Sequence, residues 1–413
     1  MSTFGSYLKD KNVYEFCNEP LFYQSEYFGI HVLKGLEELG EGLDLKNILS
    51  TSAHEIAYAQ FIGLFTEKDR YDIDERKKVV ADYFASCGFG LLDLKSIQAK
   101  GGHIDIRNEH SGKAWEKHFS LRKEGESGVG YFALGFLCGV VEAIFGSRPG
   151  TFDGKQLKCI AKGDEFSRFE IFRGFKRNIN RSAGLGRAPI NTPENSGEDS
   201  SYSLVESFSK LETDNANIER GELNWFDTSF TKHYVNYFAL VEIKLLMQAN
   251  KKLGPSGLKQ VKKLLTDVSE KSAYFTFGKI LNSAFWQEEL SSNEKIRTSG
   301  GLENCLNLLT ALGYGKWESV PTDIANQYKV VISNCPRTNA FLKLVGNTKS
   351  PIGFVNGSTL VGIANLIEKG IASIEAVDTE FVNNLAESNQ FEFVEETSRM
   401  TGNDNDTFIV SQT

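Results

Sequence analysis

The chain has 413 residues, a formal net charge of -8, and 40% hydrophobic and 24% charged residues. The acidic balance argues against nucleic-acid binding, which needs a basic field, and the length suits two or three domains. The six cysteines form no Cys-x-x-Cys pair, which excludes the usual zinc-knuckle and thioredoxin patterns. No signal peptide is visible before Asn18, so we expect a cytoplasmic protein with free thiols.

The chain begins with helical patterns. Apolar residues recur near helical spacing over residues 27–39, 43–65 and 79–86. The period then changes to two, and Lys100-Gly101-Gly102 separates two strands expected over 91–97 and 103–107. Another strand is expected over 118–121.

An apolar helix rich in glycine follows, from about Gly128 to Phe145. It is barely long enough to cross a bilayer and carries Glu142, so we expect a buried helix and no membrane span. Glu142 is expected either to be paired or exposed, or to line a pocket. A second hairpin is expected over 155–162 and 168–172.

The second part of the chain repeats the first. The matches, in the same order in both parts, are Ala85-Ser86-Cys87-Gly88-Phe89-Gly90 with Thr310-Ala311-Leu312-Gly313-Tyr314-Gly315, Arg168-Phe169-Glu170-Ile171 with Gln390-Phe391-Glu392-Phe393, Tyr27-Phe28 with Tyr237-Phe238, and Gly135 with Gly357. Their offset stays between about 210 and 226 residues, which indicates tandem copies of one domain. We expect a first copy over residues 1–177, a flexible linker over 178–222, a second copy over 223–400 and a tail over 401–413.

Each copy is expected to run from helices to a hairpin, an apolar helix and a last hairpin. In the second copy this last hairpin is expected over 371–381 and 391–394. Helices on one face of an antiparallel sheet make an α+β fold. The linker is polar, although Tyr202–Leu211 has enough apolar periodicity to dock on a domain.

No catalytic group stands out in the sequence. His54 starts a pattern like that of zinc proteases, but Tyr58 occupies the position of the second histidine. No Gly-x-Ser-x-Gly motif and no phosphate loop occurs. His103, His110 and His118 are expected either as surface residues or as a group near a strand and a loop. We therefore expect no catalytic residue.

The segment after the apolar helix reads Cys159-Ile160-Ala161-Lys162-Gly163-Asp164, followed by Phe169-Glu170-Ile171. Together with the glycine-spaced helix, this pattern resembles the 4-vinyl reductase domain family over most of the first copy. The second copy is expected to be degenerate, with Phe381 and Leu385-Ala386 in place of the cysteine and the Gly-Asp pair. The family is distantly similar to TRAPP-type tethering subunits and to haem nitric-oxide-binding domains.

The resemblance implies a domain that senses small hydrophobic ligands, serves a protochlorophyllide-like pathway or acts as a scaffold. In aromatic-sensing members, cysteines and a glutamate hold a zinc ion. Here only Cys159 of that set remains, because Gln156 and Ser167 occupy the other positions. One thiolate cannot complete a four-ligand zinc site, so we expect no metal and no cofactor.

A ligand is expected between the glycine-spaced helix and the sheet of the first copy, because glycines allow close approach. The expected lining residues are Tyr131, Phe132, Gly135, Phe136, Cys138, Cys159 and Phe169. The alternative for all of them is plain core.

The function expected from these observations is non-catalytic: sensing of a small hydrophobic ligand, or a scaffold role. The alternatives are a purely structural assembly protein without ligand and an accessory factor of a tetrapyrrole or aromatic-compound pathway. Because no output domain is present, a sensor would need a protein partner. A homo-oligomer is compatible with the pattern, whereas nucleic acid is not an expected partner.

Overall fold

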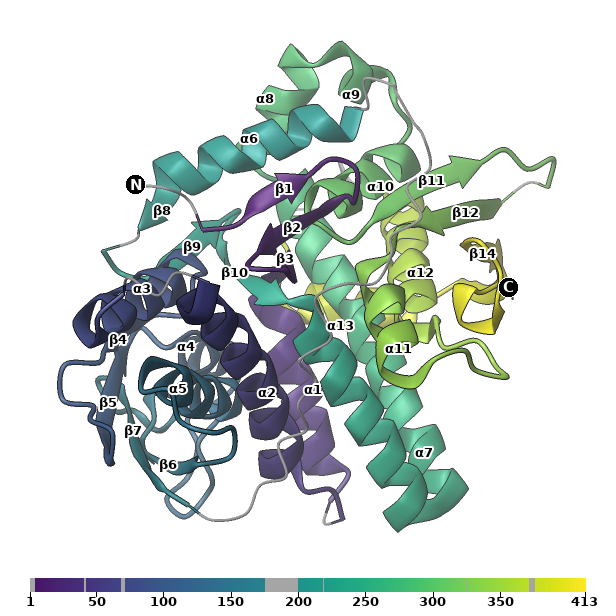
Figure 1. Cartoon of the computed structure of the whole chain (residues 1–413). Helices are drawn as coiled ribbons and strands as arrows, with labels where there is room; N and C mark the ends of the chain where they lie inside the picture. Colours follow the sequence, from purple (N-terminus) through teal and green to yellow (C-terminus); the bar gives the residue numbers. More distant parts are fainter. Residues whose placement is uncertain are drawn as a thin grey trace.

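The structure is a computed structural model, and it describes residues 4–40, 42–67, 71–174, 200–217, 219–324, 326–370 and 376–413. The fold is α+β, with antiparallel sheets and helices packed on them (Figure 1). We call β1 to β7 with their helices the first half and β8 to β14 with their helices the second half.

The first half contains seven strands and five α-helices among the described residues. In chain order they are β1 (Ser6–Leu8), β2 (Val13–Phe16), β3 (Glu19–Ser25), α1 (Glu26–Glu38), α2 (Leu45–Glu67), α3 (Ile73–Ser86), β4 (Leu91–Asp93), β5 (Gly101–Arg107), α4 (His110–His118), α5 (Tyr131–Ile144), β6 (Phe152–Lys158), the 3-10 turn η1 (Ile160–Lys162) and β7 (Ser167–Arg173). Asp72 caps the start of α3: its carboxylate accepts the Glu75 backbone amide, and the Glu75 carboxylate accepts the Asp72 amide.

The second half begins with helix α6. In chain order the elements are α6 (Ser200–Asn215), β8 (Ala216–Asn217), β9 (Glu222–Trp225), β10 (Thr228–Tyr234), α7 (Val235–Leu281), α8 (Ala284–Ser292), α9 (Glu294–Thr298), α10 (Gly301–Ala311), β11 (Lys316–Val320), β12 (Gln327–Ser333), α11 (Pro336–Val345), α12 (Phe354–Lys369), α13 (Thr379–Glu387), β13 (Phe391–Thr397), the 3-10 turn η3 (Arg399–Thr401) and β14 (Asp406–Gln412). Helix α7 is two helices in succession, because Gly254 (φ 69°, ψ -165°) is not helical.

The two halves have four-stranded sheets with the same strand order. The first sheet runs β4-β5-β7-β6 and the second runs β11-β12-β14-β13, all antiparallel. Pairing of Ile104 with Phe169 in the first sheet corresponds to pairing of Val330 with Phe408 in the second. This correspondence lets positions in the two halves be compared residue by residue.

A six-stranded sheet joins the halves, in the order β1-β2-β3-β10-β9-β8 (Figure 1). Strands β3 and β10 pair antiparallel, with Tyr23 opposite Lys232 at the centre. Because equivalent residues flank this pair on both sides, an approximate twofold axis passes through it. These strands were not predicted, because the two-residue turns that join β2 to β3 and β9 to β10 are Cys17-Asn18 and Phe226-Asp227, all with positive φ, and lack the glycine that usually marks such a hairpin.

The glycine-spaced helix α5 packs directly on α2. A Cβ atom at Gly135 would lie 1.9 Å from Ser50 O, and one at Gly139 would lie 2.6 Å from His54 O. In the second half Gly362 corresponds to Gly139, and its Cβ would lie 2.7 Å from Glu270 O on α7. The glycines therefore allow helix backbones to approach closely.

Several sequence predictions about the end of the chain are wrong. Residues 406–412, expected as part of the tail, form the inner strand β14, which pairs with both β12 and β13. The counterpart of Phe169 is consequently Phe408 and not Phe391, and the strand expected to end at 381 is replaced by α13 at 379–381; residues 371–375 lie outside the described residues. Likewise α4 occupies the start of the strand expected at 118–121.

The segment expected as a flexible linker contains helix α6. Its residues Leu204, Val205 and Phe208 are buried, and the Phe208 ring lies 6.0 Å from that of Trp225 and 5.7 Å from that of Phe285. Residues 178–199 lie outside the described part of the chain. The segment Tyr202–Leu211 was expected to dock on a domain, and its residues Leu204, Val205 and Phe208 are packed in this way.

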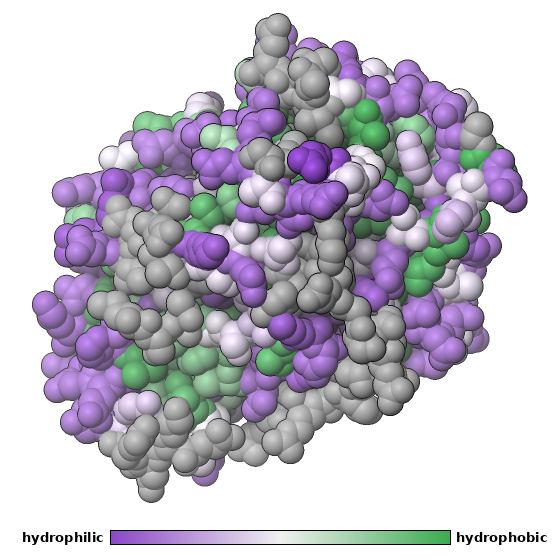
Figure 2. Space-filling view, turned by 90° about the horizontal axis from the view of Figure 1, so that it is seen from above, coloured by the Kyte–Doolittle hydropathy of each residue, from purple (hydrophilic) through white to green (hydrophobic). Residues whose placement is uncertain are grey.

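Buried apolar residues from both halves form one continuous core. On the face shown in Figure 2, hydrophilic residues predominate among the coloured atoms and hydrophobic ones form separate small groups. Within the described residues, none of the helices combines the length and the apolar character that a bilayer crossing requires.

Candidate functional site

A cavity of about 190 Å³ lies where the two halves meet. Its floor is one face of the six-stranded sheet, formed by Phe22 and Gln24 of β3 and by Thr231 and His233 of β10. Alternate residues of a strand face opposite sides, so these four side chains share one face. Helices α1 and α7, which pack against each other, supply much of the remaining wall.

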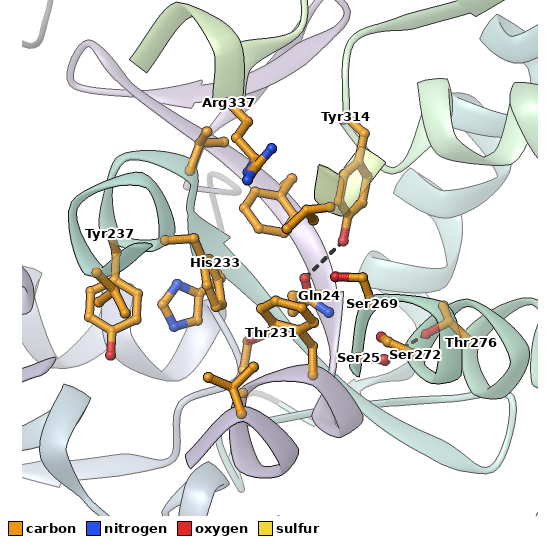
Figure 3. A pocket seen from close by; sticks show the side chains of 18 of the residues that line it. Gln24, Ser25, Thr231, His233, Tyr237, Ser269, Ser272, Thr276, Tyr314 and Arg337 are labelled. Carbon is orange, nitrogen blue, oxygen red and sulfur yellow. Dashed lines mark hydrogen bonds between the residues drawn. The ribbon is translucent and has the colours of Figure 1, made fainter. Parts of the chain in front are cut away.

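Most of the wall is apolar, and several of its polar groups satisfy one another. The Tyr314 hydroxyl donates to Gln24 Oε1 at 2.9 Å, and the hydroxyls of Ser25 and Thr276 lie 2.7 Å apart (Figure 3). The Ser269 hydroxyl donates to Leu265 O of its own helix at 2.5 Å. Polar groups that are already paired leave an occupant mainly apolar surface to contact.

His233 is a neutral donor at the cavity wall. Its Nδ1 accepts the Tyr234 backbone amide at 2.9 Å, so the proton of the neutral ring resides on Nε2. Burial, with a smaller effect of His110, lowers the pKa of His233 to about 3. The rings of Phe132 and Phe238 lie 4.5 Å and 4.7 Å from the imidazole.

A buried ion pair forms another part of the wall. Glu242 of α7 is 5% exposed, and its Oε2 accepts both Nε (3.1 Å) and Nη2 of Arg337 from α11. Burial raises the pKa of Glu242, although the Arg337 guanidinium acts in the opposite direction. In Figure 3, Arg337 and Tyr314 lie on one side of this space, and His233 and Tyr237 lie on another.

Two of the seven predicted lining residues, Tyr131 and Phe132, line the cavity. The other five, Gly135, Phe136, Cys138, Cys159 and Phe169, are buried in the packing around α5 and are not part of the lining. The space between α5 and the sheet is filled, because a Cβ at Gly130 would already lie 2.8 Å from the Phe169 ring. The cavity lies instead between the halves.

The residues around Cys159 do not assemble a metal site in the structure. Burial raises the pKa of the Cys159 thiol, Gln156 Oε1 accepts the Gly130 amide at 3.1 Å, and the Ser167 hydroxyl donates to Glu109 at 3.4 Å. Across the described residues, no group of three or more His, Cys, Asp or Glu side chains is placed to hold a metal ion.

The corresponding turn of the second half contains other residues than the sequence analysis expected. Ser398 precedes η3 as Cys159 precedes η1, and Gly402-Asn403 follows it as Gly163-Asp164 follows η1. Glu395, in the place of Gln156, accepts the Gly353 amide at 2.8 Å. Phe381 and Leu385-Ala386 are therefore not the equivalents of Cys159 and Gly163-Asp164. The prediction was wrong because residues 391–394 were matched with β7, whereas β13 corresponds to β6.

Glu142 is buried and paired. Its carboxylate accepts the Gly150 amide (3.1 Å) and the Phe152 amide (2.9 Å), and lies 2.7 Å from Nε2 of His54. This pair joins α2, α5 and the start of β6, away from the cavity. Two of the three histidines considered together, His110 and His118, lie near Glu26: His118 Nε2 is 3.2 Å from its carboxylate, and His110 lines the cavity with it, whereas His103 lies exposed on β5.

No protein-family model and no curated protein matches the chain. Among solved structures, the chain is similar to the phenol-responsive sensory domain of the transcription activator PoxR, crystallised with phenol, over 45% of this chain and 77% of that domain, with 9% sequence identity and a TM-score of 0.28. A TM-score of this size leaves the fold and the function of the chain to be argued from its own residues.

Proposed function

We propose that the chain is a non-catalytic binding protein that holds a small, mainly apolar molecule in the cavity between its halves. The observation that carries the proposal is the cavity itself, about 190 Å³ in volume, with a wall made mostly of aromatic and aliphatic side chains. A concave, mostly apolar pocket with a few placed polar groups is typical of small-molecule sites.

The size of the cavity limits the class of ligand. An apolar cavity of about 150 Å³ holds one benzene molecule, so 190 Å³ suits a ligand of roughly ten non-hydrogen atoms. A tetrapyrrole is much larger than that and does not fit this volume.

Sensing fits the position of the cavity. Strands β3 and β10 belong to different halves, and side chains of both contact the same space. A ligand that touches both halves favours the relative placement that gives it the best contacts, and it can shift an equilibrium between placements only through that difference in affinity. The signal would pass to a partner protein. We further propose that the halves are tandem copies of one domain, which the identical strand orders support, and that this domain is 4-vinyl-reductase-like, for which the support is the sequence pattern around Cys159.

The test uses two serines that are alike in the fold and differ in the space beside them. Ser269 and Ser52 are both at most 2% exposed, and both donate to the carbonyl four residues earlier, Leu265 O and Ile48 O. Ser269 lines the cavity, whereas Ser52 is not part of its lining. Leucine at 269 has room to enter the cavity; leucine at 52 has to displace packed atoms.

Binding of naphthalene is measured by fluorescence for the natural chain, Ser269→Leu and Ser52→Leu, together with their thermal melting. We expect Ser269→Leu to melt like the natural chain and to lose binding. We expect Ser52→Leu to be destabilised by about 1–3 kcal/mol and to bind normally below its melting temperature. No binding of naphthalene by the natural chain would contradict the proposal and favour a purely structural role.

A further inference from the structure

One wall of the cavity has a buried acceptor without a hydrogen-bond donor. Glu242 Oε2 receives both bonds from Arg337, whereas Glu242 Oε1 has no partner among the described residues. A carboxylate oxygen can accept more than one hydrogen bond, and a buried acceptor left unpaired is unfavourable. Glu242 belongs to the lining, so a ligand in the cavity lies beside this carboxylate.

The charge at this point is already balanced. The Arg337 guanidinium pairs with Glu242 and lies 5.1 Å from the centre of the Phe341 ring and 5.8 Å from that of Phe354. A charged ligand would add an unbalanced charge to a buried site, which is costly. A neutral group that donates one hydrogen bond avoids this cost.

At the opposite end of the cavity the buried carboxylate of Glu26 already has partners in Thr228, His118 and Lys117. By the strand register, Leu33 in the first half corresponds to Glu242 and Ser111 corresponds to Arg337, and both line the same cavity. Among the described residues that line the cavity, Glu242 Oε1 is the buried acceptor without a partner, so the two ends differ in what they bind. A ligand with one donor at its edge therefore has a single favourable orientation.

We infer that the ligand is a neutral molecule of one or two rings that carries a hydroxyl or N–H group, and that this group donates to Glu242 Oε1. The inference rests on the proposed function, since it assigns the polar contact within the same cavity. Arg337 then acts as a positioning residue that holds the Glu242 carboxylate.

Indole and indene test this assignment, because they have nearly the same shape and differ in one N–H group. Calorimetric titration of the natural chain is expected to show indole binding about tenfold or more tightly than indene, as hydrogen bonds to charged groups are the stronger ones. Equal affinities would overturn the assignment and leave the proposed function intact. Binding of neither probe would overturn both.

Variants locate the acceptor. The double variant Glu242→Met/Arg337→Met replaces the ion pair by apolar side chains, a change that folded proteins often tolerate, and it should bind both probes equally. Glu242→Gln keeps the side-chain volume and should reduce the preference for indole at least threefold. Leu33→Met, which changes an apolar side chain at the opposite end for another of similar volume, should leave the preference unchanged. A double variant that still prefers indole would place the acceptor elsewhere and overturn the inference.

Discussion

Replacing Gly135 by alanine tests whether α5 and α2 are held at backbone contact. The new Cβ would lie 1.9 Å from Ser50 O, 2.7 Å from Ser50 C and 2.9 Å from Ala53 Cβ. Non-bonded carbon atoms pack best at about 3.5–4.0 Å. The atoms that must yield are the backbone of α2, so a rotamer change cannot relieve the overlap, and the two helices have to separate.

The size of the effect follows from two opposing contributions. Overpacking of a core costs about 1–3 kcal/mol and sometimes more, and a direct backbone overlap belongs at the upper end. Alanine has a helix propensity about 1 kcal/mol better than glycine, which offsets part of that cost. We expect Gly135→Ala to lower the free energy of unfolding by about 2 kcal/mol or more.

The assay is urea unfolding, with the slope checked so that a change in midpoint reports stability. Gly63→Ala on α2 is the matched control, because its Cβ would meet no atom within 4 Å; it should stabilise the chain by up to about 1 kcal/mol. Gly357→Ala would approach the half-buried Phe393 ring at 2.3 Å, and that ring can turn aside, so its cost should be smaller. A Gly135→Ala chain as stable as the natural one would refute the reasoning.

Two further predictions concern buried groups. Burial raises the pKa of Glu19 to about 7 from its ordinary 4.5, against the hydrogen bond from Asn236 that lowers it. The stability that its proton supplies is therefore present below pH 4.5 and is lost as pH rises through 7. In urea unfolding, Glu19→Gln should match the natural chain near pH 4.5 and be more stable at pH 8, by on the order of 3 kcal/mol; an equal difference at both pH values would contradict this. Phe208→Ala on α6 should cost about 3–5 kcal/mol in chemical unfolding, because the ring is fully buried, whereas a freely moving linker would predict no change.

The matching segments 85–90 and 310–315, which indicated the repeat, have a physical cause in the contact between the halves. Gly88 and Gly313 both have positive φ, and a Cβ at Gly88 would lie 2.7 Å from Phe230 O. The preceding carbonyls make matching bonds: Cys87 O accepts the Lys232 amide and Leu312 O accepts the Tyr23 amide, both at 2.9 Å. Glycine is needed there because another backbone passes close by, and the pattern was therefore visible in the sequence.

Other residue matches between the two halves were predicted at the wrong positions, because local sequence pattern does not determine which strands and helices pair. Gly357 resembles Gly135 in its surroundings along the chain, yet Ser358 is the structural counterpart, and Gly357 faces the sheet at Phe393. The polar composition of 401–413 suggested a tail, although Phe408 and Val410 are buried in β14. Short apolar runs in polar surroundings are strands only when a sheet is available to pair with them.

The cavity could not be read from the sequence because its parts are distant along the chain. Gln24 and Tyr314 are 290 residues apart and Glu242 and Arg337 are 95 residues apart. Their approach depends on the pairing of β3 with β10, for which hydrophobic pattern gives no register between distant strands. Of the residues predicted on α5, only Tyr131 and Phe132 line the cavity, and both lie in the first turn of that helix.

The pairing of β3 with β10 also determines what each half would be on its own. Separated, each half would carry an open strand edge with unpaired backbone amides and carbonyls, and such edges recruit other chains. Within one polypeptide the two edges cover each other, from Leu21 opposite Tyr234 to Ser25 opposite Phe230. The fused chain thus closes this edge internally, and any assembly with a partner protein has to use a different surface.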